Sequence, residues 1–85
     1  MVQKNIELNK GSWLKATSAA EFIQRASEYR SSIWIEKDNK KANAKSLLGL
    51  LALEITPGCS VRISAKGEDE EEAVSELVKY IMQNV

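Results

Sequence analysis

Ser46 is the residue whose type and position best fit regulated chemistry, because its hydroxyl directly precedes a run of leucines. A serine at the start of a helix bonds free backbone N–H groups with its side-chain oxygen, and this capping role alone explains a serine there. A phosphoryl group at the same place would put negative charge at the positive end of the helix, beside apolar side chains. Position alone therefore leaves two interpretations open, a structural cap and a phosphorylation site.

The leucines that follow Ser46 are too many for a short helix that buries one face. If Leu50 and Leu53 point toward the core, three other leucines cluster on the outer side. These three are Leu47, Leu48 and Leu51. Such a cluster, if exposed, predicts an interaction site, whereas the alternative is that loops cover it or that its leucines are ordinary exposed residues.

The absence of histidine limits what else the chain can do. It removes the usual general base near neutral pH, the commonest metal ligand and phosphohistidine chemistry. Cys59 is the single cysteine, its strand pattern predicts burial, and no histidine can activate it. We therefore expect no enzymatic activity, cofactor or metal site, and phosphoryl transfer through Lys15 or Cys59 is the disfavoured enzymatic alternative.

A second polar group lies before the first expected helix. Lys15, Thr17 and Ser18 stand where free backbone amides would attract an anion, but an exposed cap explains them equally well. Lys45 belongs to a set of lysines that could attract an acidic partner, although such charges are usually only solvated.

The composition predicts one soluble, cytoplasmic domain spanning residues 1–85. Hydrophobic residues at 44% and charged residues at 28% are typical of a folded chain. The 12 basic and 12 acidic residues cancel, so no overall field favours nucleic acid. The N-terminus has no apolar run typical of a signal peptide, and no stretch is long enough to span a membrane.

The apolar periodicity predicts seven elements that must position these residues. Ser18 and Glu21 have the spacing of a capping box, so we expect the first helix to begin at Ser18. Asp38 and Asn39 suit a tight hairpin turn. The expected elements are a strand from Val2 to Leu8, a helix from Ser18 to Tyr29, strands 32–37 and 40–44, a helix from Leu47 to Glu54, a strand from Cys59 to Ala65, and a helix from Glu68 to Val85. This βαββαβα order predicts an α+β open-faced sandwich, a four-stranded antiparallel sheet with three helices on one face.

Three segments resemble the HPr family of the bacterial sugar phosphotransferase system, along the whole chain. They are Asn43-Ala44-Lys45-Ser46-Leu47-Leu48-Gly49-Leu50, the Glu36-Lys37-Asp38 hairpin and Gly67-Glu68-Asp69-Glu70. The resemblance implies the same fold, and it implies that Ser46 matches the seryl site phosphorylated by HPr kinase/phosphorylase.

The loop that holds the active histidine in this family departs from the family pattern. Where the family has Gly-Leu-His-Ala-Arg-Pro-Ala, this chain reads Trp13-Leu14-Lys15-Ala16-Thr17-Ser18-Ala19. A lysine near its usual pKa of about 10.4 is protonated at pH 7 and cannot attack phosphorus. We therefore expect no phosphocarrier activity, and the chain resembles the catabolite-repression subclass.

The resemblance also implies partners. In that subclass the seryl-phosphorylated protein is a corepressor for catabolite control protein A, a LacI-type transcription factor. Carried over, Ser46 would be modified and Leu47, Leu48 and Leu51 would contact kinase and repressor. Leu14, Lys15, Thr17 and Ala20 would border the same surface. Thr17 replaces an arginine whose charge-assisted bonds a threonine cannot make, so kinase recognition is better supported than repressor recognition. The alternative is a constitutive binding module that uses the leucines without phosphorylation.

Overall fold

The computed structural model describes residues 1–7, 16–53 and 60–83, with the side chains of 16–18 and 83 outside the description. The elements lie close to the ranges expected from the sequence. They are β1 (Val2–Glu7), α1 (Ala16–Ala26), β2 (Ser32–Lys37), β3 (Lys40–Asn43), α2 (Leu47–Ala52), β4 (Ser60–Lys66) and α3 (Glu70–Gln83). The predicted order of strands and helices is confirmed.

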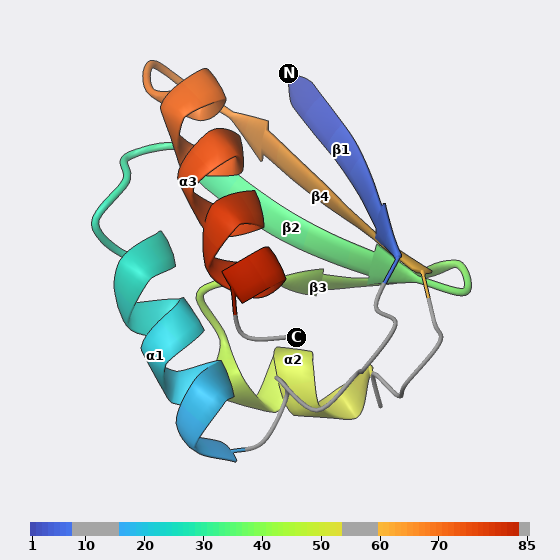
Figure 1. Ribbon diagram of the computed structural model, residues 1–85. Coiled ribbons are helices and arrows are strands. Elements are labelled where there is room, and N and C mark those ends of the chain that lie inside the picture. Colours follow the sequence, from blue (N-terminus) through green and yellow to red (C-terminus); the bar gives the residue numbers. More distant parts are fainter. Residues whose placement is uncertain (8–15, 54–59, 84–85) are drawn as a thin grey trace.

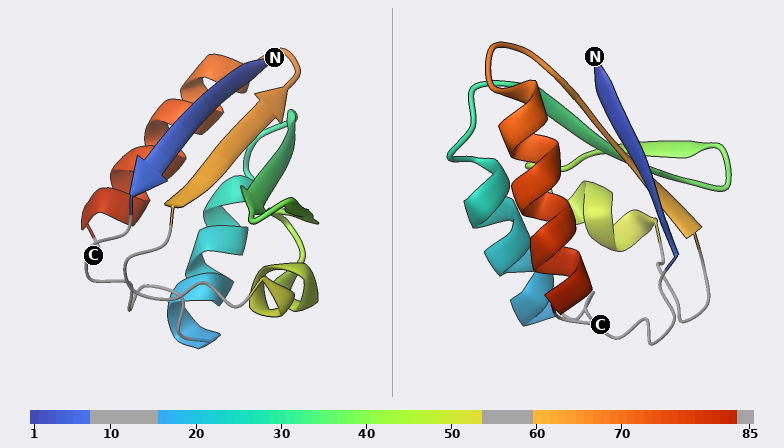
Figure 2. Two further views of the ribbon diagram at one scale, coloured as in Figure 1. Left: turned by 90° about the vertical axis from the view of Figure 1, so that its right-hand side faces the viewer. Right: turned by 45° about the horizontal axis from the view of Figure 1, so that its top comes forward.

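The four strands form one antiparallel sheet in the order β1-β4-β2-β3. All three helices lie on one face of this sheet, with α3 along β1 and β4 and α2 below β3 (Figure 1). The two further views show the same layering, with the opposite face of the sheet uncovered (Figure 2). The predicted open-faced α+β sandwich is therefore confirmed.

The core lies between the sheet and the helices, because apolar residues alternate along the strands and recur at helical spacing. Ile33 and Ile35 of β2, together with Ile63 of β4, are fully buried and point toward the helices. The fully buried large residues that meet them from the helices are Phe22, Leu50, Leu77 and Ile81. The alternation in the sequence thus selects which face of each strand is covered.

The hairpin between β2 and β3 turns where the sequence predicts it. Asp38 and Asn39 both have positive φ, at 50° and 67°, which is the geometry of a two-residue turn that matches the strand twist. Short polar side chains tolerate this left-handed region. The β2–β3 register follows from that turn and sets Trp34 opposite Asn43.

Two local expectations were wrong. Helix α1 begins at Ala16, so Ser18 lies within its first turn and cannot be the N-cap that the Ser18–Glu21 spacing predicted. Ser64 was expected on the exposed face of β4 but is buried, because its neighbours Gln3 and Trp34 in the flanking strands carry larger side chains. Its hydroxyl has no hydrogen-bond partner among the described residues.

Two residues that the sequence predicts in strands, Leu8 and Cys59, lie outside the described residues.

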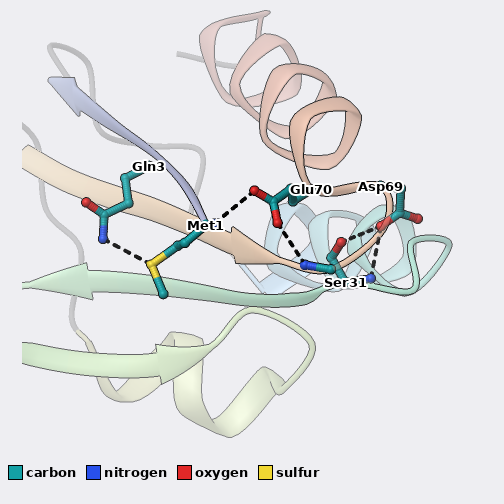
Figure 3. Close-up of polar contacts among 6 residues, drawn as sticks. Met1, Gln3, Ser31, Asp69 and Glu70 are labelled. Atoms are coloured by element: carbon teal, nitrogen blue, oxygen red, sulfur yellow. Dashed lines mark hydrogen bonds and ion pairs between the residues drawn. The ribbon is translucent and has the colours of Figure 1, made fainter.

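The start of α3 is tied to the segment before β2 by one carboxylate. Asp69 accepts the backbone N–H of Ser31 at 3.0 Å, and the Ser31 hydroxyl also donates to it (Figure 3). Asp69 also accepts the backbone N–H of Arg30 at 2.9 Å. Gly67 has a φ of 154°, and a Cβ there would approach the Ser31 backbone to 2.7 Å. Only glycine therefore allows this contact.

Glu70 makes a second junction beside the first. Its carboxylate accepts the Gly67 N–H at 3.1 Å and lies 3.0 Å from the ammonium of Met1, so it joins the start of β1 to the start of α3 (Figure 3). The Ser31 hydroxyl lowers the pKa of Asp69, and the Gly67 N–H lowers that of Glu70. Both groups are thus held ionised by hydrogen bonds.

We expect the stability of the protein to fall on acidification, because Asp69 and Glu70 have lower pKa values folded than unfolded. Their contribution is complete above the unfolded pKa and is lost as the pH falls from about 5 toward 2. Asp69→Asn should lower the thermal midpoint at pH 7 and flatten its dependence on pH in this window. Calorimetry across the pH range measures both effects.

The matched control is Asp38→Asn, the same change in charge at the exposed hairpin turn, where asparagine also accepts a positive φ. It should leave the thermal midpoint nearly unchanged. Equal losses in the two variants would show that the Asp69 contacts with Arg30 and Ser31 are not what stabilises this junction.

Candidate functional site

Ser46 caps α2, as the sequence predicts. Its backbone is extended, with φ −116° and ψ 118°, and its side-chain oxygen accepts the N–H of Gly49 at 3.2 Å. Its carbonyl accepts the first helical bond, from the N–H of Leu50 at 3.0 Å. These contacts define an N-cap, so the hydroxyl lies at the positive end of the helix.

The turn that leads from β3 into Ser46 is held by hydrogen bonds of its backbone N–H groups. Ala44 donates its N–H to the carbonyl of Ile33 at 2.9 Å, which extends the pairing of β2 and β3. Asn43 accepts twice, from the N–H of Ser46 at its carbonyl and from the N–H of Lys45 at its side chain. Ser46 therefore has a fixed position relative to the sheet.

The side chain of Lys45 helps to hold this turn in place. Its ammonium donates to the carbonyls of Tyr29 at 2.9 Å and Ser31 at 3.0 Å, and the side chain is half-buried. These bonds join the turn to the segment between α1 and β2. Sequence reasoning treated Lys45 only as a surface charge that could attract a partner, because no local pattern shows which distant carbonyls a lysine will reach.

The leucines of α2 divide as the sequence predicts. Leu50 is 0% exposed and Leu53 is 4% exposed, so these two enter the core. The other three form the leucine patch, with exposures of 41% for Leu47, 81% for Leu48 and 39% for Leu51. Because these exposed leucines are grouped together directly beside a helix cap, they mark a candidate contact site.

A lysine ammonium supports the C-terminal end of α2. Lys37 donates from its ammonium to the carbonyl of Leu53 at 3.1 Å, next to the last turn of the helix. A positive charge at this end stabilises the helix dipole and satisfies a free carbonyl. Because α2 is only 6 residues long, such contacts and its packing on α1 and β3 are needed to hold it.

The remaining predicted site residues come from the segment before and within α1. Ala20 is exposed on α1, which packs against α2, so it lies on a helix that adjoins the leucine patch. Leu14 and Lys15 lie outside the described residues, and only the backbone of Thr17 is described, in the first turn of α1. Their predicted contribution to the surface stays a prediction.

The described ranges hold no candidate metal site, since they contain no group of three or more Cys, Asp, Glu or His side chains that could bind an ion. No helix in these ranges is both long enough and apolar enough to cross a membrane. The cytoplasmic location expected from the sequence stays a prediction.

Comparison with known proteins places this geometry in a family. The family profile described as "PTS HPr component phosphorylation site" matches residues 2–83. The HPr-like protein Crh of Bacillus subtilis is 42% identical over 85 residues, which cover all of both chains. A protein of the same name from Halalkalibacterium halodurans is 43% identical over 81 residues, 95% of this chain and 96% of its own.

Solved structures agree with these sequence matches. The crystal structure of HPr-C-His from Thermoanaerobacter tengcongensis has a TM-score of 0.92 at 46% identity, covering 99% of this chain and 94% of that one. A crystal structure of Bacillus subtilis Crh, described as a swapped dimer, has a TM-score of 0.79 at 42% identity, covering 100% and 98%. The chain belongs to the HPr family, and its relatives include both phosphocarrier proteins HPr and HPr-like Crh proteins.

Proposed function

We propose that this chain is a regulatory HPr-like protein that HPr kinase/phosphorylase phosphorylates on Ser46. In this proposal a LacI-type catabolite-control transcription factor then binds the phosphorylated form. The observation that carries the proposal is the position of Ser46, whose hydroxyl caps α2 directly beside the exposed leucine patch. The kinase would find a hydroxyl beside an apolar surface, and the reader protein would find the phosphate beside the same surface.

Phosphorylation is compatible with the cap. The Ser46 oxygen accepts from Gly49 and keeps its own proton, which a base of the kinase would remove as the oxygen attacks the γ-phosphorus of ATP and ADP leaves. The phosphate then adds acceptor oxygens and about two negative charges at the positive end of α2. The helix therefore need not unfold, so the modified surface differs from the unmodified one mainly in charge.

The charge of such a phosphate would be available to a reader protein. The neighbouring ammonium of Lys45 already donates to two backbone carbonyls, and its side chain is half-buried. Cationic side chains of a partner would therefore supply the opposite charge, while the leucine patch supplies apolar contact. Binding that needs both features depends on phosphorylation, which is the property of a switch.

The relatives and the histidine-free sequence support a regulator over a phosphocarrier. Two of the matched proteins carry the name Crh, and the Bacillus subtilis protein in the swapped-dimer crystal structure is described as a catabolite repression containing protein. This chain has no histidine to carry a phosphoryl group. Thr17 in place of the family arginine makes the kinase step better supported than binding to the repressor.

A second candidate function rests on the same patch without the switch. Leu48 is 81% exposed in the unmodified protein, so a partner can contact it before any phosphate is present. A constitutive binding module would use the leucine patch in this way. Pull-down of a partner that Ser46→Ala leaves unchanged would favour this candidate over the regulated one.

We expect HPr kinase/phosphorylase with ATP to add one phosphate to the protein, located on Ser46. Intact mass and peptide mapping measure the number and the position. Ser46→Ala should remain unmodified, whereas Ser75→Ala, a matched change at an exposed serine of α3, should be modified like the wild type. Failure of the folded wild-type protein to accept phosphate would end the proposal, as would acid-labile phosphate gained from enzyme I.

The free energy of unfolding of Ser46 variants tests the capping role of this residue. Ser46→Ala removes the acceptor for the Gly49 N–H and should lower the free energy of unfolding by about 1 kcal/mol. Ser46→Asp keeps an acceptor and adds charge at the helix start, so it should be close to wild type. Urea denaturation measures both variants. If Ser46→Asp were the less stable of the two, a negative group would not be tolerated at this cap.

The leucine patch is tested by comparing an exposed leucine with a buried one. Leu48→Ala should change the free energy of unfolding by less than about 0.5 kcal/mol. The same variant should weaken binding to the kinase or to the reader protein roughly tenfold, the effect of losing a significant interface contact. Leu50→Ala, by contrast, should destabilise the fold by about 2–5 kcal/mol. Unchanged partner affinity in Leu48→Ala would remove the patch from the interface.

A further inference from the structure

Gly49 is the third residue of α2, a position where glycine weakens the helix. Glycine inside a helix is less favourable than alanine, because it loses more conformational freedom on folding. The third helical residue is also the place where glutamate or glutamine would complete a capping box with Ser46. The segment from Ser46 to Gly49 therefore has the spacing of a capping box but lacks its second member.

Neither the backbone nor the packing of α2 requires glycine at this position. Gly49 has helical backbone, whereas Gly67 is the glycine of the described ranges that has a positive φ. Gly49 is half-buried, and a Cβ there would lie 3.4 Å from the Cβ of Ala42 on β3. Two carbon atoms at that distance are in van der Waals contact and do not overlap severely. Alanine would therefore fit the unmodified protein.

A side chain at position 49 would change the space around the Ser46 oxygen. The Gly49 N–H donates to that oxygen at 3.2 Å, and a Cβ on Gly49 would lie 3.4 Å from the same oxygen. The backbone nitrogen and this Cβ would be bonded to the same Cα. The Cβ would therefore cover the side of the oxygen that the Gly49 N–H faces.

We propose that Gly49 is a specificity-determining residue for phosphorylation of Ser46, because it leaves free the space that the phosphoryl group needs. This inference rests on the proposed function. In that reaction the Ser46 oxygen bonds to the γ-phosphorus of ATP, its proton passes to a base of the kinase, and ADP leaves. The phosphate brings three further acceptor oxygens, and one of them can accept the Gly49 N–H in a charge-assisted bond.

The two forms of the protein thus favour different residues at position 49. A phosphate oxygen that accepts the Gly49 N–H must lie beside the Gly49 Cα, next to the place that a Cβ would occupy. Alanine would turn the phosphoryl group away from this N–H, and glutamate would also place a like charge beside it. The unmodified helix favours alanine, whereas the phosphorylated one favours glycine.

Kinase assays on folded variants test the proposal. Gly49→Ala should lower kcat/KM of HPr kinase/phosphorylase for the protein roughly tenfold, and Gly49→Glu should lower it further. Ser75→Gln, which adds a side chain of similar size at an exposed position of α3, should be phosphorylated like the wild type. Equal values of kcat/KM for the wild type and Gly49→Ala would contradict the proposal.

The double variant Gly49→Ala, Ala42→Gly tests the alternative that Gly49 lets α2 pack closely on β3. It removes the contact between these two Cβ atoms and keeps the contact with the Ser46 oxygen. Its kcat/KM should stay as low as that of Gly49→Ala, while the amide spectrum shows that the fold is intact. Recovery of the wild-type value would assign Gly49 to packing and overturn the proposal.

A second measurement needs no kinase. Phosphoserine is introduced at position 46 during synthesis of the protein, and thermal midpoints are compared with and without the phosphate. Gly49→Ala should raise the midpoint of the unmodified protein by roughly 2–8 °C, because alanine is the better helix former. It should lower the midpoint of the phosphorylated protein. A shift of the same sign and size in both forms, or a lower midpoint in the unmodified form, would overturn the proposal.

Failure of this inference and failure of the proposed function give different results. If the kinase left the folded wild type unmodified, the proposed function would fail, and the thermal midpoints of the phosphoserine forms would still decide the role of Gly49. If the kinase modified the wild type and Gly49→Ala at the same rate, this inference alone would fail.

Discussion

Ser31 is the point on which the arrangement of this small fold depends. Its N–H and hydroxyl bind the carboxylate of Asp69 at the start of α3, and its carbonyl accepts the ammonium of Lys45 in the turn before α2. Gly67 packs so closely against it that no side chain fits between them. One buried serine thus joins the end of the α1 region, the start of α3 and the approach to Ser46, and each junction limits where the others can lie.

The position of the candidate site depends more on these tertiary contacts than on the intrinsic stability of helix α2. A helix as short as α2 is marginal by itself, because forming a first turn fixes several residues for few hydrogen bonds. Leu50 and Leu53 bury its inner side, Lys37 bonds its last turn, and Lys45 fixes the turn before it. With that support in place, the largely exposed Leu48 need not contribute to stability.

The sequence by itself determined the order of the elements, the hairpin turn at Asp38 and Asn39, the cap at Ser46 and the division of the leucines of α2. Each depends on periodicity or turn chemistry within a few residues, which a sequence displays directly. It misplaced the start of α1, because the Ser18–Glu21 spacing of a capping box recurs by chance inside helices.

Only the tertiary structure decided the burial of Ser64, the bonds of Lys45 to two distant carbonyls and the contacts of Asp69 with Arg30 and Ser31. Each of these depends on strand order and on which distant backbone groups meet. Residues as far apart in the chain as Ser31 and Asp69 come together only when the sheet and its helices pack, and no local pattern encodes that distance.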